Sequence, residues 1–293
     1  MAPSPKGLVL DLLSTVRTGS MPVRALVAAG GLFGIEENRL RVALTRLLSD
    51  GLLDRDQRGA YRLRRSRGVS ALVTGWRRIE SRATRWNGHW IAVLAGTVSR
   101  STASASSPAR GARRAEDRAL RLLGFRWLQR GVAIRPANFT ESLAETRTRL
   151  IDLGLRPESG VACLDEVDDA TRSHARTLWD TAGLRREYAR AIAQLDASRQ
   201  RLPRMTEARA MVESFRVGGN VIRQIVRDPL LPPPLVPAGE LAGVVRAMRA
   251  YDNAGRTCWR PFLERHGIDF ADAPAGVAAH ESGSREHAFG GIA

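Results

Sequence analysis

Residues 35–64 carry the clearest alternation of apolar and polar positions in the chain. Between residues 38 and 49, apolar side chains return at the 3.6-residue helical period and form one stripe, made of Leu40, Ala43, Leu44, Leu47 and Leu48. Polar and basic side chains occupy the opposite side. Gly51 follows the last turn, where glycine readily adopts a left-handed cap. The pattern therefore predicts a helix that buries one face and exposes arginines on the other.

Two shorter amphipathic segments precede this helix. They span Leu8–Val16 and Val23–Ala29, and each predicts a short helix. The sequence Ser20–Pro22 is a plausible start for the second one, since proline is tolerated in a first helical turn. The glycine-rich run 30–34 predicts a sharp bend before the third helix.

A basic hairpin is predicted directly after the third helix. Residues 52–55 and 60–63 alternate apolar and polar positions on either side of a short turn. Three helices followed by a hairpin, in this order and at these lengths, are typical of a winged helix-turn-helix. We therefore assign residues 1–65 to a DNA-binding domain of that class. The alternative is a small helical domain whose arginine face is only solvated.

The hydrophobic period changes over residues 86–165. Short apolar runs predict strands at 90–94, 125–129, 132–135 and 161–164, and helical patterns lie at 110–123 and 140–153. Thr140 is the candidate cap of the second of these helices. The resulting order, βαββαβ, is that of a ferredoxin-like domain, an antiparallel sheet with two helices on one face.

The remaining segments complete a three-domain chain of the α+β class. Residues 66–85 are predicted to form a connecting helix, and residues 166–268 a C-terminal helical domain. The proline run 228–234 must interrupt those helices as an extended connection. Residues 269–293 are small, polar and glycine-rich, and they predict a disordered tail. Four tryptophans are expected to pack in the core or between domains rather than stack on bases: Trp86, Trp90, Trp127 and Trp179.

The net charge of the chain indicates a negatively charged partner. The formal charge is +16, and residues 1–85 contribute +9 of it from 16 basic and 7 acidic side chains. Basic density therefore concentrates on the winged-helix segment, as binding to a polyanion requires. Lys6 is the single lysine among 46 basic residues, so part of the charge reflects genome base composition.

Several functional classes lack their sequence signatures. Cys163 and Cys258 show no metal-ligand spacing and are too few for a disulfide framework, which indicates reduced thiols. The sequence contains no Gly-Lys phosphate loop, no G-x-S-x-G elbow and no H-E-x-x-H pair. It also shows no signal peptide and no apolar run of membrane-spanning length. We therefore expect a cytoplasmic, nucleoid-associated protein that is not an enzyme and uses no metal or cofactor.

A set of short motifs runs in order along residues 6–265. These motifs are RLRVALTRLLSDGLL at 39–53, Trp86-x-Gly88-x-Trp90, Leu123-Gly124-Phe125 with Gly131 and Pro136, LW at 178–179 with Leu184 and Tyr188, and RDPLLPPPLVP at 227–237. With these motifs the chain resembles the PaaX family of bacterial transcriptional repressors. The resemblance implies a winged helix, a ferredoxin-like domain and a helical domain in that order, which agrees with the segmentation above.

The resemblance also implies partners and a mode of regulation. It implies a homodimer bound to a partly palindromic operator at genes of phenylacetate and related aromatic-acid catabolism. Release by an acyl-CoA thioester such as phenylacetyl-CoA is implied as well, and the helices at 204–265 are the expected dimer surface. Two departures are present: Gly51-Leu52-Leu53 replaces the common Gly-Trp-Leu, and the loop 97–109 is unusually rich in Ser and Ala. The second departure leaves the effector open.

Nine side chains are expected to contact DNA. Four on the outward helical face are predicted to enter the major groove: Asn38, Arg41, Val42 and Thr45. Arginine there reads guanine, and a methyl group meets the thymine methyl. Two arginines flanking that face suit phosphate contacts: Arg39 and Arg46. Three on the hairpin suit the backbone or the adjacent minor groove: Arg55, Arg58 and Arg62. For Val42 and Arg46, packing against the preceding helices is the alternative.

Two other functions remain open. An architectural DNA-binding protein would need only the basic domain and a dimer interface, so the roughly 200 residues beyond that domain count against it. A nucleic-acid-processing enzyme on the ferredoxin-like domain would need a carboxylate for Mg²⁺ at the end of the first strand. That position reads Val93-Leu94-Ala95-Gly96, without a carboxylate.

Overall fold

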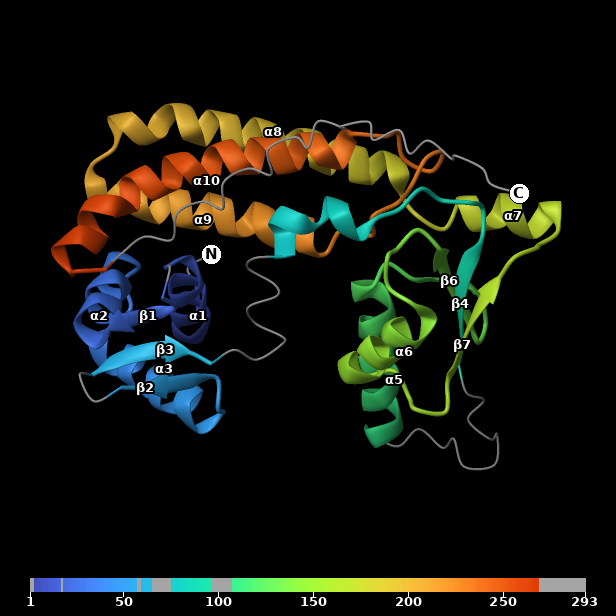
Figure 1. Ribbon diagram of the computed structural model, residues 1–293, viewed down its shortest axis with the longest axis horizontal. Coiled ribbons are helices and arrows are strands. Elements are labelled where there is room, and N and C mark those ends of the chain that lie inside the picture. The colour runs from blue at the N-terminus through green and yellow to red at the C-terminus, as the bar shows by residue number, and fades with distance from the viewer. Residues whose placement is uncertain (1–2, 17, 57–58, 65–74, 96–106, 269–293) are drawn as a thin grey trace, which may run out of the picture.

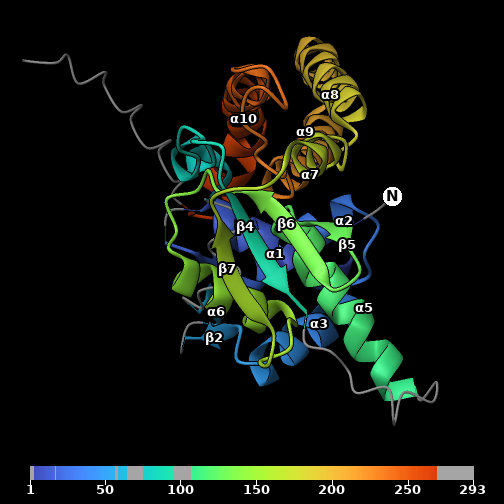
Figure 2. The same cartoon turned by 90° about the vertical axis from the view of Figure 1, so that its right-hand side faces the viewer.

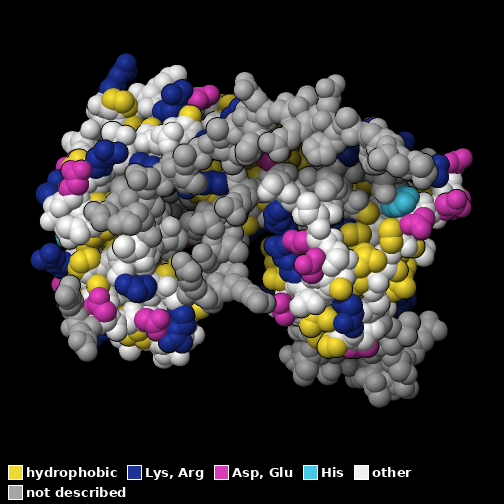
Figure 3. Space-filling model, viewed as in Figure 1, with side chains coloured by type: hydrophobic (Ala, Val, Ile, Leu, Met, Phe, Trp, Pro, Cys, Tyr) yellow, Lys and Arg dark blue, Asp and Glu magenta, His cyan; other side chains and the backbone are white. Residues whose placement is uncertain are grey.

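The chain folds into a mixed α+β structure with two small antiparallel sheets (Figure 1). The computed structural model describes residues 3–16, 18–56, 59–64, 75–95 and 107–268. Three long helices form a layer: α8 (Thr181–Arg201), α9 (Glu207–Val226) and α10 (Glu240–Arg265). Two smaller units lie side by side against this layer, and a recess separates their lower parts (Figure 3). No helix within the described residues is long and apolar enough to cross a membrane.

The N-terminal unit contains three helices and a three-stranded sheet. Its elements are α1 (Pro5–Thr15), β1 (Ser20–Pro22), α2 (Val23–Leu32), α3 (Glu37–Ser49), β2 (Leu53–Arg55) and β3 (Ala60–Leu63). The strands lie in the order β1-β3-β2, and both neighbouring pairs are antiparallel. Leu26, Leu40, Leu44 and Leu47 are buried where the helices meet. The three helices and the hairpin expected from the sequence are therefore present.

Two details of this unit differ from the sequence expectations. The run 30–32 continues α2 instead of bending, and a side chain at Gly30 would come within 3.3 Å of Leu40 on α3. The glycine thus permits close packing of two helices, and the bend falls at Gly34, whose φ is +70°. Ser20–Pro22 forms strand β1 rather than a helix start, because its backbone pairs with β3.

The central unit contains a four-stranded sheet and two helices. Its elements are β4 (Trp90–Leu94), α5 (Ser107–Leu122), β5 (Arg126–Gln129), β6 (Val132–Pro136), α6 (Leu143–Leu153) and β7 (Gly160–Leu164). The strand order is β5-β6-β4-β7, antiparallel throughout. Helices α5 and α6 cover one face around Phe125 and Leu150 (Figure 2). The second helix starts after Ser142 and not at Thr140, because Ser142 and Glu145 form a capping box.

The opposite face of this sheet packs on aromatic side chains. Trp90 is 1% exposed, stacks on Trp179 at 6.0 Å between ring centroids, and meets Trp86 edge-on at 5.0 Å. Trp90 and Trp179 are therefore core residues, as expected, and Trp86 is partly buried. Trp127 differs because it lies on the edge strand β5, where it is 40% exposed. Its indole N–H donates to Asp117 of α5 at 3.1 Å.

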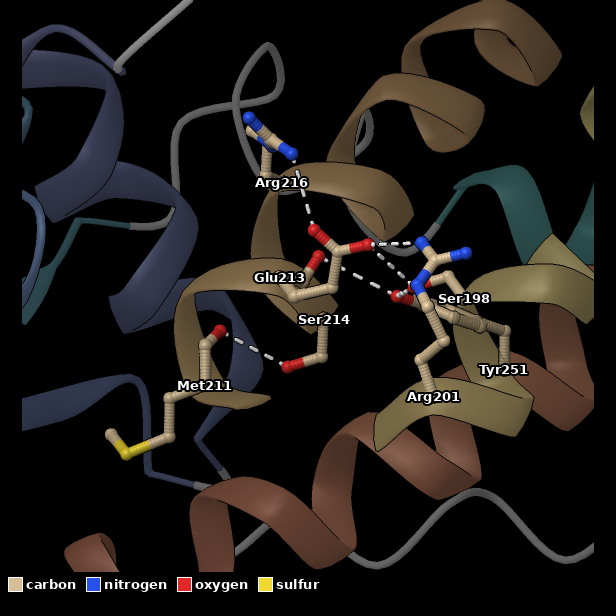
Figure 4. Close-up of polar contacts among 7 residues, drawn as sticks. All are labelled: Ser198, Arg201, Met211, Glu213, Ser214, Arg216 and Tyr251. Atoms are coloured by element: carbon tan, nitrogen blue, oxygen red, sulfur yellow. Dashed lines mark hydrogen bonds and ion pairs between the residues drawn. The ribbon is translucent and has the colours of Figure 1, made fainter. Parts of the chain in front are cut away.

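A polar network ties the three long helices together (Figure 4). The Ser198 hydroxyl of α8 lies 3.0 Å from the Glu213 carboxylate of α9 and 2.8 Å from the Tyr251 hydroxyl of α10. Arg201 and Arg216 form ion pairs with Glu213 at 2.8 and 3.2 Å. Burial raises the pKa of Tyr251 to about 12, so its hydroxyl keeps its proton at neutral pH. Because the buried hydroxyls of Ser198 and Tyr251 are paired, the network favours one register of the three helices.

The N-terminal unit shares its core with the helical layer. Met211 of α9 and Trp259 and Phe262 of α10 belong to the same buried cluster as the leucines of α1, α2 and α3. The rings of Phe33 and Phe215 also meet edge-on, with centroids 5.1 Å apart. The N-terminal helices therefore pack against one end of α9 and one end of α10.

The expected connecting helix over 66–85 does not continue through residues 76–85, and residue 75 is the last α-helical position. Residues 75–85 contain two short 3-10 turns, Trp76–Arg78 and Glu80–Arg82, and residues 65–74 lie outside the described segments. Trp76 and Ile79 are each 2% exposed and pack in the core of the helical layer. Burial of these two side chains against α9 and α10 accompanies the short 3-10 turns of residues 76–82. The tail 269–293 also lies outside the described segments.

The connection between α9 and α10 is non-helical, as the proline run predicts. The Asn138 amide of the central unit donates to the Leu230 carbonyl at 2.7 Å. The Asp228 carboxylate accepts from the Tyr188 hydroxyl at 2.6 Å and from the Leu230 N–H at 2.8 Å. Residues near the proline run therefore hold the central unit and the helical layer together.

Asp228 is expected to make the stability of this junction depend on pH. Burial raises the pKa of Asp228 to about 6, against an ordinary value of 3.8, and its two hydrogen bonds only partly oppose this. The folded state therefore holds the proton more tightly than the unfolded state. Between about pH 4 and pH 6, the free energy of unfolding should fall as pH rises, by up to about 1.4 kcal/mol per pH unit from this group.

Urea unfolding of the wild type and of Asp228→Asn, measured from pH 4 to pH 7, isolates this contribution. The variant should gain stability relative to the wild type as pH rises through the window, and the difference should level off above it. Parallel pH profiles for the two proteins would contradict the assignment.

Candidate nucleic-acid interface

The outward face of α3 is exposed along its length. Six of the predicted DNA contacts lie there and are exposed: Asn38, Arg39, Arg41, Val42, Thr45 and Arg46. Val42 is 44% exposed although it is apolar, whereas Leu40, Leu44 and Leu47 on the inner face are at most 1% exposed. Val42 and Arg46 are therefore not buried against the preceding helices.

Arg41 is held by a carboxylate on its own helix. Its guanidinium contacts the Glu37 carboxylate, at 2.7 Å through Nε and 2.6 Å through Nη2. Both side chains are more than half exposed, so the pair contributes at most about 0.5 kcal/mol and opens readily. The Thr45 hydroxyl donates to the Arg41 carbonyl at 3.2 Å. A contact between Arg41 and a guanine must first displace Glu37.

A shallow groove of about 340 Å³ lies between α3 and the start of α1. It is lined by Ser4, Pro5, Lys6, Asn38, Arg39, Val42, Ala43 and Arg46. Three cationic side chains, Lys6, Arg39 and Arg46, therefore converge on one concave surface. Lys6 also pairs with Asp50, which caps the end of α3, at 2.8 Å. Lys6 was missed among the sequence candidates, and its being the only lysine in the chain is the signal that could have identified it.

The hairpin arginines do not share one surface. Arg55 lies opposite Tyr61 in the ladder, and its guanidinium stacks over that ring at 5.7 Å from the centroid. Arg62 lies opposite Asp54, on the alternate face, because successive strand residues point to opposite sides. Arg64 binds Asp54 at 2.6 Å, and this hydrogen bond lowers the pKa of that carboxyl. The described part of the hairpin therefore carries mixed charge, and Arg55 and Arg62 lie on opposite faces of it.

The groove is the one place where several predicted contacts meet in the described part of the N-terminal unit. Four candidates line it: Asn38, Arg39, Val42 and Arg46. Arg41 and Thr45 lie elsewhere on the same helix, and Arg58 lies outside the described residues. Figure 3 shows basic and acidic side chains mixed on the visible face of this unit.

A second hollow, of about 360 Å³, lies between the central unit and the helical layer. Trp179 and Leu184 contribute apolar walls. The charge of the lining is mixed, with two arginines and three carboxylates: Arg126, Arg227, Asp180, Glu187 and Asp228. The buried Nε2 of Gln224, another lining residue, has no hydrogen-bond partner among the described residues. Buried polar groups are normally paired, so this nitrogen is an exception among the described residues.

Comparison with known proteins gives one protein of similar fold and no function. No protein-family profile matches the chain, and no curated protein matches it. Among solved structures, the chain is similar to the uncharacterized protein Rv0674 from Mycobacterium tuberculosis, with 24% sequence identity and a TM-score of 0.55. The match covers 83% of this chain and 92% of that chain. A likeness at this level of identity shows a shared fold alone.

Proposed function

We propose that this protein is a sequence-specific DNA-binding transcriptional regulator. Specifically, it is a dimeric repressor of aromatic-acid catabolic genes that an acyl-CoA thioester releases from DNA. The observation that carries the DNA-binding part is the groove at α3, where Lys6, Arg39 and Arg46 lie beside exposed base-contacting candidates. Phosphate contacts of this kind fix the register of a protein on DNA, and side chains on base edges supply the specificity.

We assign the N-terminal unit to the winged helix-turn-helix class. Its support is a third helix with one exposed face, followed at once by the β2–β3 hairpin. We assign the central unit to the ferredoxin-like class. Its support is the order β5-β6-β4-β7, in which the first and third strands of a βαββαβ unit lie at the centre of the sheet.

The second hollow supports the proposed effector. Its volume of about 360 Å³ lies in the range of small-molecule sites and suits an acyl group, but not a whole coenzyme A thioester. The nucleotide part must then lie outside. Arg126 and Arg227 offer charge to its phosphates, whereas Asp180, Glu187 and Asp228 at the same hollow oppose an anion. By linkage, DNA must weaken thioester binding by the same factor by which the thioester weakens DNA binding.

Fluorescence anisotropy of a labelled DNA fragment from upstream of this gene tests the proposal. At about 150 mM salt, we expect binding at least about 1,000-fold tighter than to a scrambled fragment of equal length. Phenylacetyl-CoA, or another thioester in a panel of acyl-CoA compounds, should abolish this binding. Leu184→Trp, which fills the hollow, should bind DNA normally and lose the release.

The outcomes separate the parts of the proposal. Selective DNA binding that no thioester changes would discard the effector and keep the regulator. Weak binding that is equal for all sequences would contradict a regulator and favour the architectural protein. Release that survives in Leu184→Trp would contradict the assignment of the hollow.

A further inference from the structure

A cluster of His, Cys and Asp lies at one end of the central sheet, away from the groove at α3. His89 precedes β4, Cys163 lies in β7, and Asp165 follows β7. One ligand atom from each, Nδ1, Sγ and a carboxylate oxygen, lies within 4.8 Å of the other two. Asp165 Oδ1 is 3.3 Å from Cys163 Sγ and 3.5 Å from His89 Nδ1.

The register of the sheet brings these residues together. Ile91 pairs with Cys163, so His89, two residues earlier, stands opposite Asp165, two residues later. Alternate residues of a strand share a face, and therefore all three side chains leave the sheet on the same side. Strand β7 is an edge of the sheet, and Cys163 is exposed there. The cluster is thus preformed by the backbone and open to solvent.

Hydrogen bonds join the ligand atoms to each other and to a neighbouring side chain. The Cys163 thiol donates to Asp165, and the Asn87 side-chain amide lies 3.2 Å from His89 Nδ1. Loss of the thiol proton leaves a thiolate and a carboxylate, whose two negative charges match a divalent cation. The observed 3.3 and 3.5 Å separations are close to the roughly 3.3–3.8 Å expected between neighbouring ligands of a tetrahedral zinc ion.

We propose that His89, Cys163 and Asp165 bind a divalent transition-metal ion of the zinc type. One imidazole, one thiolate and one carboxylate favour such an ion over Mg²⁺ or Ca²⁺, which prefer oxygen ligands alone. A water molecule completes the tetrahedron, as at zinc sites with three protein ligands. Spacing rules along the sequence missed this site because its ligands come from two strands that are far apart in the chain.

A metal ion at this cluster would connect the two segments of chain that run between the central unit and the helical layer. Residues 83–89 enter β4 from the turns that pack on α10, and residues 165–168 lead from β7 to α7 (Asp169–Arg176) (Figure 2). His89 and Asp165 stand at the two junctions. Metal occupancy therefore links the two segments and restrains the central unit where it meets the layer.

Titration of the reduced, chelator-treated full chain with Co²⁺ tests the proposal. We expect one equivalent to bind with a near-ultraviolet thiolate-to-cobalt absorption band and tetrahedral visible bands, and Zn²⁺ should displace it. Cys163→Ser should abolish the thiolate band and weaken binding at least about tenfold. His89→Gln and Asp165→Asn should each weaken binding while the thiolate band remains at saturation.

Cys258→Ser is the matched control, because Cys258 is the other cysteine of the chain and packs within the helical core. This variant should bind Co²⁺ like the wild type. Circular dichroism of each variant verifies that it is folded. The proposal is overturned if no thiolate band appears at micromolar Co²⁺, if the band survives in Cys163→Ser, or if it disappears in Cys258→Ser.

Discussion

Replacing both Arg39 and Arg46 with alanine is expected to weaken binding to every DNA sequence by about 100-fold. Both side chains are exposed and line the groove between α1 and α3. A charge-assisted contact contributes about 1.5 kcal/mol, and two of them account for that factor. Since each phosphate contact releases counterions, the slope of log affinity against log salt should also become shallower by about 2. Anisotropy titrations from about 50 to about 300 mM salt measure the affinity and its salt slope.

A matched double variant separates local contacts from net charge. Arg190→Ala with Arg199→Ala removes the same charge from exposed positions on α8. It should change the affinity for DNA by less than about threefold, because these positions lie far from the groove and screening is strong. Equal losses in the two double variants would show that only overall charge matters. Loss of selectivity without a change in salt slope would mean that Arg39 or Arg46 contacts bases and not phosphates.

Replacing Arg135 with methionine is expected to destabilise the protein by about 2–4 kcal/mol. Arg135 is 5% exposed, and its guanidinium lies 3.3 Å from the centroid of the Phe139 ring. It donates to the carbonyls of Leu123, Pro136 and Pro229, so it bonds the sheet to the connection between α9 and α10. Methionine keeps much of the aliphatic volume but removes the donor from these buried or partly buried carbonyls.

Lysine at position 135 should not rescue the protein. An ammonium group cannot stack on an aromatic ring as a planar guanidinium does, nor reach three carbonyls in a fixed fork. Arg149→Met is the matched control, since Arg149 is 42% exposed and bonds only Glu141 in the structure described, at 2.6 Å. It should cost less than about 1 kcal/mol. Urea unfolding followed by tryptophan fluorescence gives the comparison, and a stable Arg135→Lys would contradict the proposed role of the guanidinium.

Local patterns predicted the elements better than their boundaries. The stripe from Leu40 to Leu48 identified α3, because a helix buries residues at a fixed period. The strand at Ser20–Pro22 was missed because three residues are too few to show a strand periodicity. Their extended conformation depends on pairing with β3. The predicted connecting helix does not extend through residues 76–85 for a related reason, since Trp76 and Ile79 pack in the core of the helical layer.

The candidate site was predictable along α3 and not beyond it. The exposed face of one helix follows from periodicity, so the six positions there could be named from the sequence. The approach of Lys6 depends on how α1 packs on α3, and the pairing of Arg64 with Asp54 depends on the strand register. Neither relation leaves a signal in the spacing of residues along the chain.

The core shared by the N-terminal helices with α9 and α10 bears on how this protein can be divided. Trp259 is 7% exposed and Phe262 is 5% exposed, both within that cluster. A fragment that ends after the hairpin would carry an uncovered apolar patch, and such patches promote aggregation. The N-terminal unit is therefore not separable from the rest of the chain. To transfer its proposed DNA specificity to another protein, the ends of two helices about 150 to 200 residues further along the chain must be transferred with it.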